Sequence, residues 1–256
     1  CLSLMGESVR MVTDFFQMVG DVMIRMTNYV MLYAPIGVFG LIAYTVTRHG
    51  LSVLLPLGKL ILTAFIATVI FVVVTYLPII KLIGMKISDY LKGAFEPWLI
   101  AFTTCSSAAA LAVNLEASRK MGASKAIASF AIPLGNTINM NGTSIYMGVT
   151  AVFAAEVFGI DLTLTQQFQI VLMGVLAAVG TAGVPGAGLI MTTLVFTEVG
   201  IPLEAVALIA GIDRILDMIR TSVNVLGDSL TALVVSKSEG VLGTEPMDQD
   251  TVVKEV

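Results

Sequence analysis

The stretch DRILDMIRTSVNVLGD, residues 213–228, places polar side chains at helical spacing inside apolar sequence. Five of these side chains, which we call the polar stripe, are Asp213, Asp217, Arg220, Asn224 and Asp228. At about 100° per helical residue they fall within an arc of about 80° and extend over about 22 Å of one helix. The carboxylates invite cations, and an arginine pairs with a carboxylate through two parallel hydrogen bonds. This combination indicates a binding site for an acidic amino acid together with metal cations.

The rest of the composition is typical of a membrane protein. Hydrophobic residues make up 57% of the 256 residues and charged residues 12%. Uncharged runs of roughly 18 residues or more, the length that indicates a bilayer span, cover 26–47, 60–80, 97–115, 126–155 and 162–197. A charge at the bilayer centre costs about 2.5–3.5 kcal/mol, so the polar stripe is expected to face protein, water or ions.

Charge and cysteine content count against other classes of protein. The net charge is −4 and part of it lies in an acidic tail, so a nucleic-acid partner is not expected. Cys1 and Cys105 are far apart in the sequence and indicate neither a disulfide framework nor a metal cluster. Because residue 1 is Cys and no signal peptide precedes the first apolar segment, we expect the sequence to begin inside a longer protein.

Lysine and arginine near membrane ends mark the cytoplasmic side and so predict a topology. Applied to this chain, the rule predicts an outward helix at 26–47, a returning helix at 54–82, a re-entrant segment at 97–115, an outward crossing at 126–155, a re-entrant segment at 162–197, and a last helix that returns to the cytoplasm near Lys237. The C-terminus is therefore expected in the cytoplasm.

Three short segments interrupt these apolar runs. The sequence GTAGVPGAG at 180–188 cannot continue a helix and is expected to turn the chain. The sequence GNTINMNGT at 135–143 predicts an unwound turn whose carbonyls, with Asn139 and Met140, suit a monovalent cation; a kink with interhelical hydrogen bonds is the alternative. The sequence TTCSS at 103–107 offers hydroxyls and amides to a carboxylate, or else a packing surface of small residues.

Two opposed re-entrant segments, each followed by a helix, predict an inverted repeat of residues 97–155 against 162–236. Inverted repeats are typical of transporters, whose substrates bind near the midplane of the bilayer. The polar stripe and the three interruptions are expected to meet there.

In order and spacing these motifs resemble those of the dicarboxylate/amino acid:cation symporter family, also called the glutamate transporter family. The resemblance rests on Ser106-Ser107, on NMNGT at 139–143, on GTAGVPG at 180–186 and on residues 217–228. It implies an all-α membrane protein with transmembrane helices and two re-entrant helical hairpins, which moves as an elevator within a homotrimer in the plasma (inner) membrane.

The resemblance also implies three regions of the chain. Residues 1–50 would belong to a scaffold or trimerisation domain, 51–238 would form the transport domain, and 239–256 would be a cytoplasmic acidic tail.

The same resemblance assigns a substrate site residue by residue. Arg220 would hold the side-chain carboxylate of the substrate and Asp217 its ammonium group, while Asn224 with Ser107 would hold the α-carboxylate. The other residues assigned to this site are Ser106, Thr143, Gly186, Gly188, Asp213 and Thr221.

Two sodium sites are implied in the same way. One would use Gly135, Asn139, Asn224 and Asp228. The other would use the carbonyls of Thr137, Ala178, Val179 and Thr181 with the sulfur of Met140. Sodium-driven members of the family typically have Asp where this chain has Asn141, which counts against a third sodium site.

A second departure concerns an extra arginine that members with acidic substrates often place near the substrate. In this chain the tip of the first hairpin has Cys105 instead. Arg214 is a substitute for that arginine, or else it pairs with Asp213 or a neighbouring group.

The leading hypothesis is sodium-coupled symport of aspartate or glutamate, and no enzymatic activity. A close alternative is proton-coupled symport of glutamate or a C4-dicarboxylate, motivated by Asn141 and by the adjacent Asp213 and Arg214. Two other classes are an intramembrane enzyme that activates water with Asp213 and Asp217, and a channel lined by carboxylates. Arg220 in the polar stripe counts against a cation channel, and no second helix supplies a partner motif for an enzyme.

Overall fold

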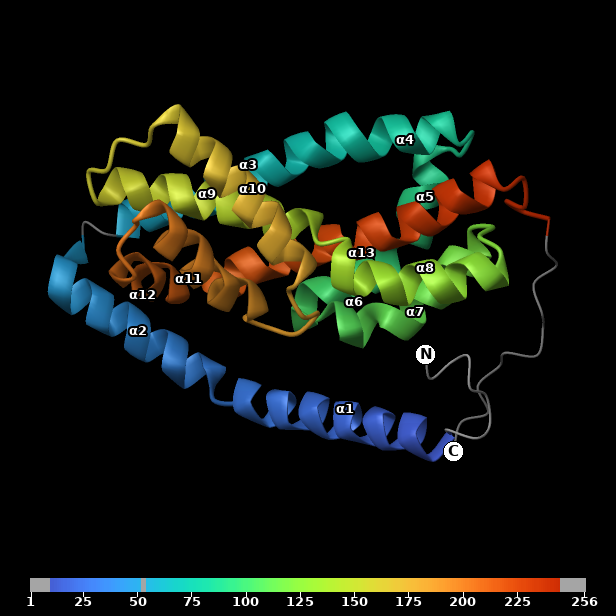
Figure 1. The fold of residues 1–256 in the computed structure, drawn as a ribbon, viewed down its shortest axis with the longest axis horizontal. Coiled ribbons are helices and arrows are strands. Elements are labelled where there is room, and N and C mark those ends of the chain that lie inside the picture. Colours follow the sequence, from blue (N-terminus) through green and yellow to red (C-terminus); the bar gives the residue numbers. More distant parts are fainter. Residues whose placement is uncertain (1–9, 52–53, 245–256) are drawn as a thin grey trace.

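The computed structural model describes residues 10–51 and 54–244, and within these ranges every regular element is a helix (Figure 1). In chain order the elements are α1 (Arg10–Met31), α2 (Ala34–His49), α3 (Leu54–Phe71), the π-helical turn η4 (Val72–Tyr76), α4 (Leu77–Leu82), α5 (Ile87–Gly93), α6 (Phe95–Thr104), α7 (Ser107–Lys120), α8 (Lys125–Ile138), α9 (Asn141–Val157), α10 (Leu164–Val179), α11 (Ala187–Val199), α12 (Glu204–Ala210) and α13 (Asp213–Ser238). The all-α class is thus confirmed for the described part of the chain.

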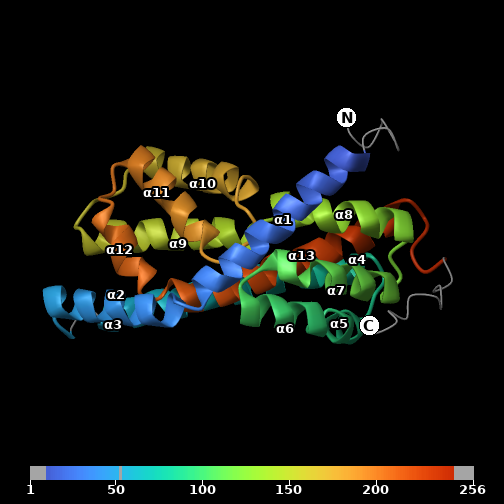
Figure 2. The ribbon, with the colours of Figure 1, turned by 90° about the horizontal axis from the view of Figure 1, so that it is seen from below.

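The first apolar run does not form the single helix that we predicted over residues 26–47. Helix α1 ends at Met31 and α2 begins at Ala34, with Pro35 in its first turn. Proline has no N–H and a fixed φ, so it suits the first turn of a helix and breaks a helix that would otherwise continue. Both helices lie along the outside of the molecule (Figures 1 and 2).

The helix predicted over residues 54–82 is continuous but changes its hydrogen-bonding pattern. Elements α3, η4 and α4 follow one another without a break from Leu54 to Leu82. The wider π-helical turn ends just before Pro78, which lacks the N–H that an α-helix would use there. Among the described helices, this one alone is long and apolar enough to cross a membrane.

Helices α6 and α7 form a first helical hairpin inside the apolar run 97–115. Its tip is Cys105 and Ser106, and Cys105 adopts the left-handed conformation with φ of 57°. The hydroxyl of Ser106 accepts a hydrogen bond from the Ala109 N–H and so caps α7. The TTCSS segment therefore ends one helix and starts the next.

A second helical hairpin is formed by α10 and α11, and its tip is the predicted glycine-rich turn. Residues 180–186 connect the two helices, and Gly186 has a φ of 76°, which favours glycine. The break predicted within 135–143 is also confirmed, because α8 ends at Ile138 and α9 begins at Asn141. Pro133 lies inside α8 and lowers the helical stability of this segment.

Helix α13 runs through the centre of the molecule. It packs against α3, α6, α7, α8 and α9, and α9–α12 lie toward one end of it while α5–α8 lie toward the other (Figures 1 and 2). The tips of the two hairpins meet near its middle, where the Ala108 N–H donates to the Gly183 carbonyl at 3.2 Å. All five residues of the polar stripe are buried, so the stripe faces other parts of the protein, one of the three surroundings that we expected.

Candidate functional site

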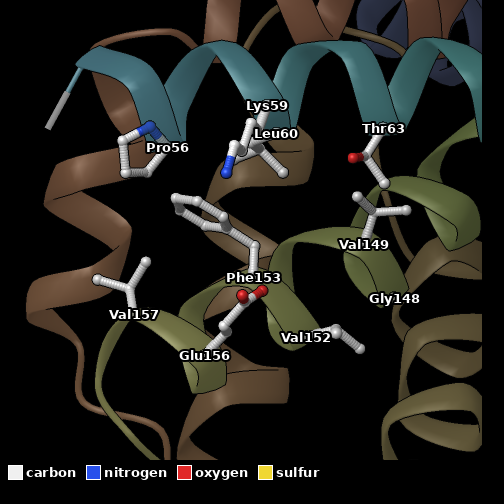
Figure 3. Close-up of a pocket in the computed structure, with 10 residues that line it drawn as sticks. All are labelled: Pro56, Lys59, Leu60, Thr63, Gly148, Val149, Val152, Phe153, Glu156 and Val157. Carbon is white, nitrogen blue, oxygen red and sulfur yellow. The ribbon is translucent and has the colours of Figure 1, made fainter.

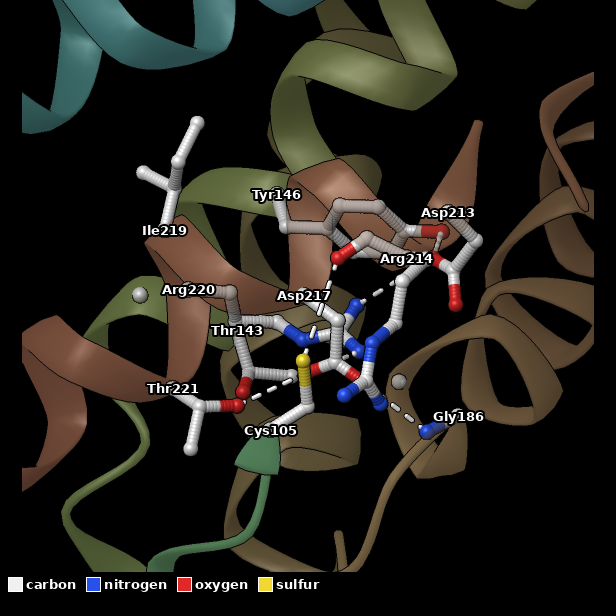
Figure 4. A network of polar contacts seen from close by, with 12 residues as sticks. Cys105, Thr143, Tyr146, Gly186, Asp213, Arg214, Asp217, Ile219, Arg220 and Thr221 are labelled. Carbon is white, nitrogen blue, oxygen red and sulfur yellow. Dashed lines mark hydrogen bonds and ion pairs between the residues drawn. The ribbon is translucent and has the colours of Figure 1, made fainter. Parts of the chain in front are cut away.

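The charged part of the polar stripe forms a compact network (Figure 4). Arg220 Nη2 lies 2.9 Å from Asp217 Oδ1, and Arg220 Nη1 lies 3.7 Å from Asp213 Oδ1. The guanidinium also lies over the ring of Tyr146, with Cζ 4.3 Å from the ring centre. Tyr146 in turn donates its hydroxyl to Asp213 at 2.8 Å. Arg220 is 4% exposed, so two carboxylates and an aromatic ring compensate a charge that is almost fully buried.

Asp217 links this network to the second hairpin. Its Oδ1 accepts from the Thr221 hydroxyl at 2.7 Å, and its Oδ2 accepts from the backbone N–H of Gly186 at 2.8 Å. Gly188 allows the first turn of α11 to approach Arg220, because a Cβ at that position would lie 2.5 Å from Arg220 Cζ. The glycine-rich sequence thus forms the turn and, at Gly188, also leaves the space that Arg220 occupies.

Asn224 connects α13 to the start of α9. Its Oδ1 accepts from the Gly142 N–H at 2.7 Å, one of the first N–H groups of α9. Its Nδ2 lies 3.2 Å from the Thr143 hydroxyl and 3.0 Å from the Met140 sulfur. Gly142 packs directly on the carbonyl of Arg220, where any side chain would collide.

The two hairpin tips touch each other beside this network. The Gly183 carbonyl accepts from the Ser106 hydroxyl at 2.9 Å and from the Ala108 N–H. Ser107 is 2% exposed, and its hydroxyl has no hydrogen-bond partner within the described residues. A buried hydroxyl without a partner is costly, so Ser107 is a candidate contact for a polar ligand.

A cavity of about 10 Å³ lies between these groups, roughly the room for one water molecule. Seven of the ten residues assigned to the substrate line it: Ser107, Thr143, Gly188, Asp217, Arg220, Thr221 and Asn224. The other three assigned residues do not line the cavity but contact residues that do. Ser106 and Gly186 form hydrogen bonds with Gly183 and Asp217, and Asp213 forms an ion pair with Arg220.

The residues assigned to the first sodium site also come together. Asn139 Nδ2 donates to Asp228 Oδ1 at 2.8 Å and approaches the Asn224 carbonyl at 3.4 Å. A Cβ at position 135 would lie 2.5 Å from Asp228 Oδ1, so Gly135 lets the carboxylate approach α8 closely. Asn141 donates to the Asn139 side-chain oxygen at 2.7 Å and to the Tyr76 hydroxyl at 3.0 Å.

This donor set suits a hard monovalent cation better than a transition metal. It offers the Asp228 carboxylate and the Asn224 backbone carbonyl, the kind of ligand that hard cations prefer, while Asn139 directs its Nδ2 toward both. No group of three or more His, Cys, Asp or Glu side chains that could hold a metal ion occurs in residues 10–51 and 54–244.

The second proposed sodium set is only partly gathered around the cavity. Met140 and Thr181 line it. Thr137 and Val179 are exposed, and the Ala178 carbonyl accepts from the Thr181 N–H at 3.0 Å. The resemblance assigns only backbone carbonyls to Thr137, Ala178 and Val179, and their side chains are not part of the network.

Sequence analysis missed two tyrosines in these networks. Tyr146 follows Thr143 by three residues on α9 and is the only tyrosine after position 90. That spacing on one helical face is the signal that would have found it. Tyr76, which contacts Asn141 and donates to the Val223 carbonyl at 3.2 Å, lies in another helix and had no such signal.

A larger cavity of about 590 Å³ lies between α3 and α9 (Figure 3). Apolar side chains such as Leu60 and Phe153 line most of it, and Lys59 and Glu156 point into the same space. It contains no residue of the polar stripe. We therefore take the small cavity, on which buried polar groups converge, as the candidate site.

Comparison with known proteins places these features in a family. The model of the "Sodium:dicarboxylate symporter family" matches residues 1–238. A "Proton/sodium-glutamate symport protein" of Geobacillus stearothermophilus is 39% identical over 95% of this chain and 58% of its own length. A "Proton/glutamate-aspartate symporter" of Escherichia coli is 39% identical over 88% of this chain and 51% of its own. A "C4-dicarboxylate transport protein" of Bacillus subtilis is 39% identical over 93% and 57%.

The chain thus spans a little over half the length of these curated relatives. The match covers all the motifs on which the sequence-based resemblance rested, and the family is one of symporters rather than enzymes. The chain belongs to the sodium:dicarboxylate symporter family.

Proposed function

We propose that the protein is a secondary active symporter that carries aspartate or glutamate together with a cation. The observation that carries this proposal is the buried guanidinium of Arg220 at the wall of the small cavity. Its Nη1 has no hydrogen-bond partner in the described part of the chain. A guanidinium offers parallel donors to a carboxylate, so an acidic substrate satisfies this group. The names of the relatives support the same class of substrate.

Asp217 favours an amino acid over a plain dicarboxylate. Its carboxylate pairs with Arg220 and is held by Thr221 and Gly186. Once a substrate carboxylate pairs with Arg220 in place of Asp217, the Asp217 carboxylate needs a new cationic partner. The ammonium group of an amino acid is such a partner. A plain dicarboxylate would leave a buried carboxylate poorly compensated, which is costly. Symport of a C4-dicarboxylate is therefore the second candidate, supported by the relative of that name.

Entry of a substrate requires one hairpin tip to move, because the cavity has room for about one water molecule. The second tip contacts its surroundings through the Gly186 N–H and the Gly183 carbonyl. These are few hydrogen bonds in a glycine-rich segment, so the second hairpin is the one that we expect to open. Closure then places the Gly186 backbone on Asp217 and excludes water from Arg220.

Asp228, Asn139 and Asn224 are the residues that we expect to hold the coupling cation. Sodium suits their oxygen atoms, and a proton on Asp228 is the alternative. Asn224 also contacts the substrate cavity, so a cation that orders Asn224 favours the closed form. A ligand that binds one form better than another shifts the equilibrium, and the coupling to the substrate is reciprocal.

The arrangement of the described helices supports the assembly that the resemblance implies. We propose that α1 and α2 belong to a scaffold of a homotrimer in the inner membrane, that both hairpins are re-entrant, and that residues 51–238 move as an elevator with the C-terminus in the cytoplasm. Large exposed apolar side chains on α1 and α2 support a lipid or subunit contact. Of the acidic tail predicted at 239–256, residues 245–256 lie outside the described residues.

Uptake by the full-length protein in liposomes tests the proposal. Labelled aspartate is supplied first with an inward sodium gradient and then with a proton gradient without sodium, and succinate is the competitor. Arg220→Lys keeps the charge but loses the parallel donors, so we expect uptake to fall by about tenfold or more. Arg119→Lys on α7 is the matched control. Undiminished aspartate uptake by Arg220→Lys would contradict the assigned role.

A further inference from the structure

Arg214 is adjacent to Asp213 in the sequence but is directed at the first hairpin. Its Nη2 donates to the Thr103 carbonyl at 2.9 Å, and its Nη1 lies 3.4 Å from the Thr104 carbonyl. Its own backbone carbonyl lies 3.8 Å from the Cys105 sulfur. One residue of α13 thus contacts three consecutive residues where α6 ends. Asp213 has other partners, Tyr146 and Arg220.

The end of α6 has groups that such a cation satisfies. The last carbonyls of a helix have no partner within the helix, and they carry partial negative charge. The chain then turns at Cys105 with positive φ, where glycine is the usual residue. A planar guanidinium donates to two neighbouring carbonyls at once, which holds the strained turn in one place.

The position of this turn decides where the first tip meets the rest of the site. Ser106 and Ala108 follow directly and contact the Gly183 carbonyl of the second tip. Ser107 lies between them and lines the small cavity. A shift of Cys105 would therefore displace every contact of the first tip.

We propose that Arg214 is a positioning residue that fastens the first hairpin tip to α13 and does not contact the substrate. The first tip then stays fixed while the second tip moves. The effect on uptake rests on the proposed function, whereas the attachment of the tip does not.

Labelling of Cys105 tests the attachment directly. Cys105 is 1% exposed, and the only other cysteine of the 256 residues is Cys1. Full-length protein carrying Cys1→Ser is treated with N-ethylmaleimide in liposomes without substrate, and peptide mass spectrometry follows the modification of Cys105. Arg214→Ala should raise the labelling rate several-fold, and Arg214→Lys, with one ammonium group, should restore part of the protection. Arg119→Ala, near the other end of α7, is the control and should leave the rate unchanged.

If Arg214 affected Cys105 only through its charge, Arg214→Ala would slow the labelling. Removal of a neighbouring cation disfavours the reactive thiolate, so faster labelling in Arg214→Ala requires a more accessible thiol. In uptake assays the same variant should raise the KM for aspartate more than it lowers the maximal rate, because Ser107 is displaced. An unchanged labelling rate in Arg214→Ala would overturn the proposal, whatever happens to uptake. Faster labelling in a protein that takes up no acidic amino acid would support the attachment and contradict only the proposed function.

Discussion

Gly188 shows how a residue without a side chain shapes the charged network. Its position in the first turn of α11 leaves Arg220 the space that a methyl group would fill. The guanidinium can therefore lie between Asp217 and the ring of Tyr146. Because the protein surrounds it closely, Arg220 has little freedom to move aside.

Gly188→Ala should accordingly lower uptake while the protein still folds. The new Cβ would lie 2.5 Å from Arg220 Cζ and displace the guanidinium from its carboxylate partners. We expect uptake of labelled aspartate by full-length protein in liposomes to fall by about tenfold or more, since misplacement by about 1 Å has effects of that order or larger. Gly148→Ala is the matched control, because nothing lies within 4 Å of a Cβ there. Equal uptake by the two variants would remove Gly188 from the site.

Asp228→Asn should impair cation coupling and spare the fold. Asparagine keeps the shape and the contact with Asn139 but removes the charge on which a sodium ion depends. We expect the KM for sodium to rise by about tenfold or more, equal to about 1.4 kcal/mol of binding. Asp161→Asn, in the exposed connection before α10, is the control. Unchanged sodium dependence, with uptake that no longer responds to a proton gradient, would instead assign Asp228 to protons.

At the scale of elements, the two hairpins depend on one contact at Gly183. A Cβ at this position would collide with the Ser107 hydroxyl and lie 3.0 Å from Asn136 Oδ1. The carbonyl of Gly183 also accepts both hydrogen bonds from the first tip. Close approach of two backbones is thus the condition for closure.

Gly183→Ala should keep the second hairpin from closing. We expect loss of aspartate uptake, together with faster proteolysis of the second tip in the presence of substrate and sodium. Gly180→Ala lies in the same turn, where a Cβ would make only ordinary contacts at 3.7 Å, and it should behave like the unmodified protein. Full uptake by Gly183→Ala would show that closure does not need this contact.

Some elements could be predicted from the sequence and others could not. The turn at Gly180–Gly186 and the break before Asn141 follow local composition, because glycine, proline and amide side chains interrupt a helix wherever they lie. The TTCSS segment at Cys105 contains none of these residues, so re-entry there was predicted only from the placement of basic residues. The prediction of a single helix over 26–47 was wrong. The uncharged apolar run indicated one continuous span, whereas Pro35 lies in the first turn of a new helix. Hydropathy reports burial in lipid or protein, and it does not report helix continuity.

At the scale of the whole molecule, α1 and α2 lie outside the helices that surround α13 (Figure 2). Their exposed side chains include Phe39, which is 75% exposed. Exposed apolar faces of this kind are suited to a scaffold that contacts lipid or another subunit.

If α2 forms the subunit contact of the proposed homotrimer, Phe39→Ala should weaken that assembly. Loss of a large aromatic contact lowers packing energy at a subunit interface by up to a few kcal/mol. Native mass spectrometry of the full-length protein in detergent measures the ratio of trimer to monomer. Phe168→Ala on α10 removes a side chain that is similarly exposed, at 68%, and should leave that ratio unchanged. If both variants dissociate alike, α2 is not part of the trimer contact.

The sequence by itself determined the helical class, the membrane-like composition, the polar stripe on one helix, and the glycine-rich turn of the second hairpin. All of these depend on periodicity and on the backbone preferences of neighbouring residues, which a sequence carries locally. Only the tertiary structure decided that Tyr146 lies under Arg220, that Gly183 connects the two tips, and that Arg214 faces α6 instead of Asp213. These contacts join residues tens of positions apart, so they depend on how whole helices dock, which no local pattern specifies.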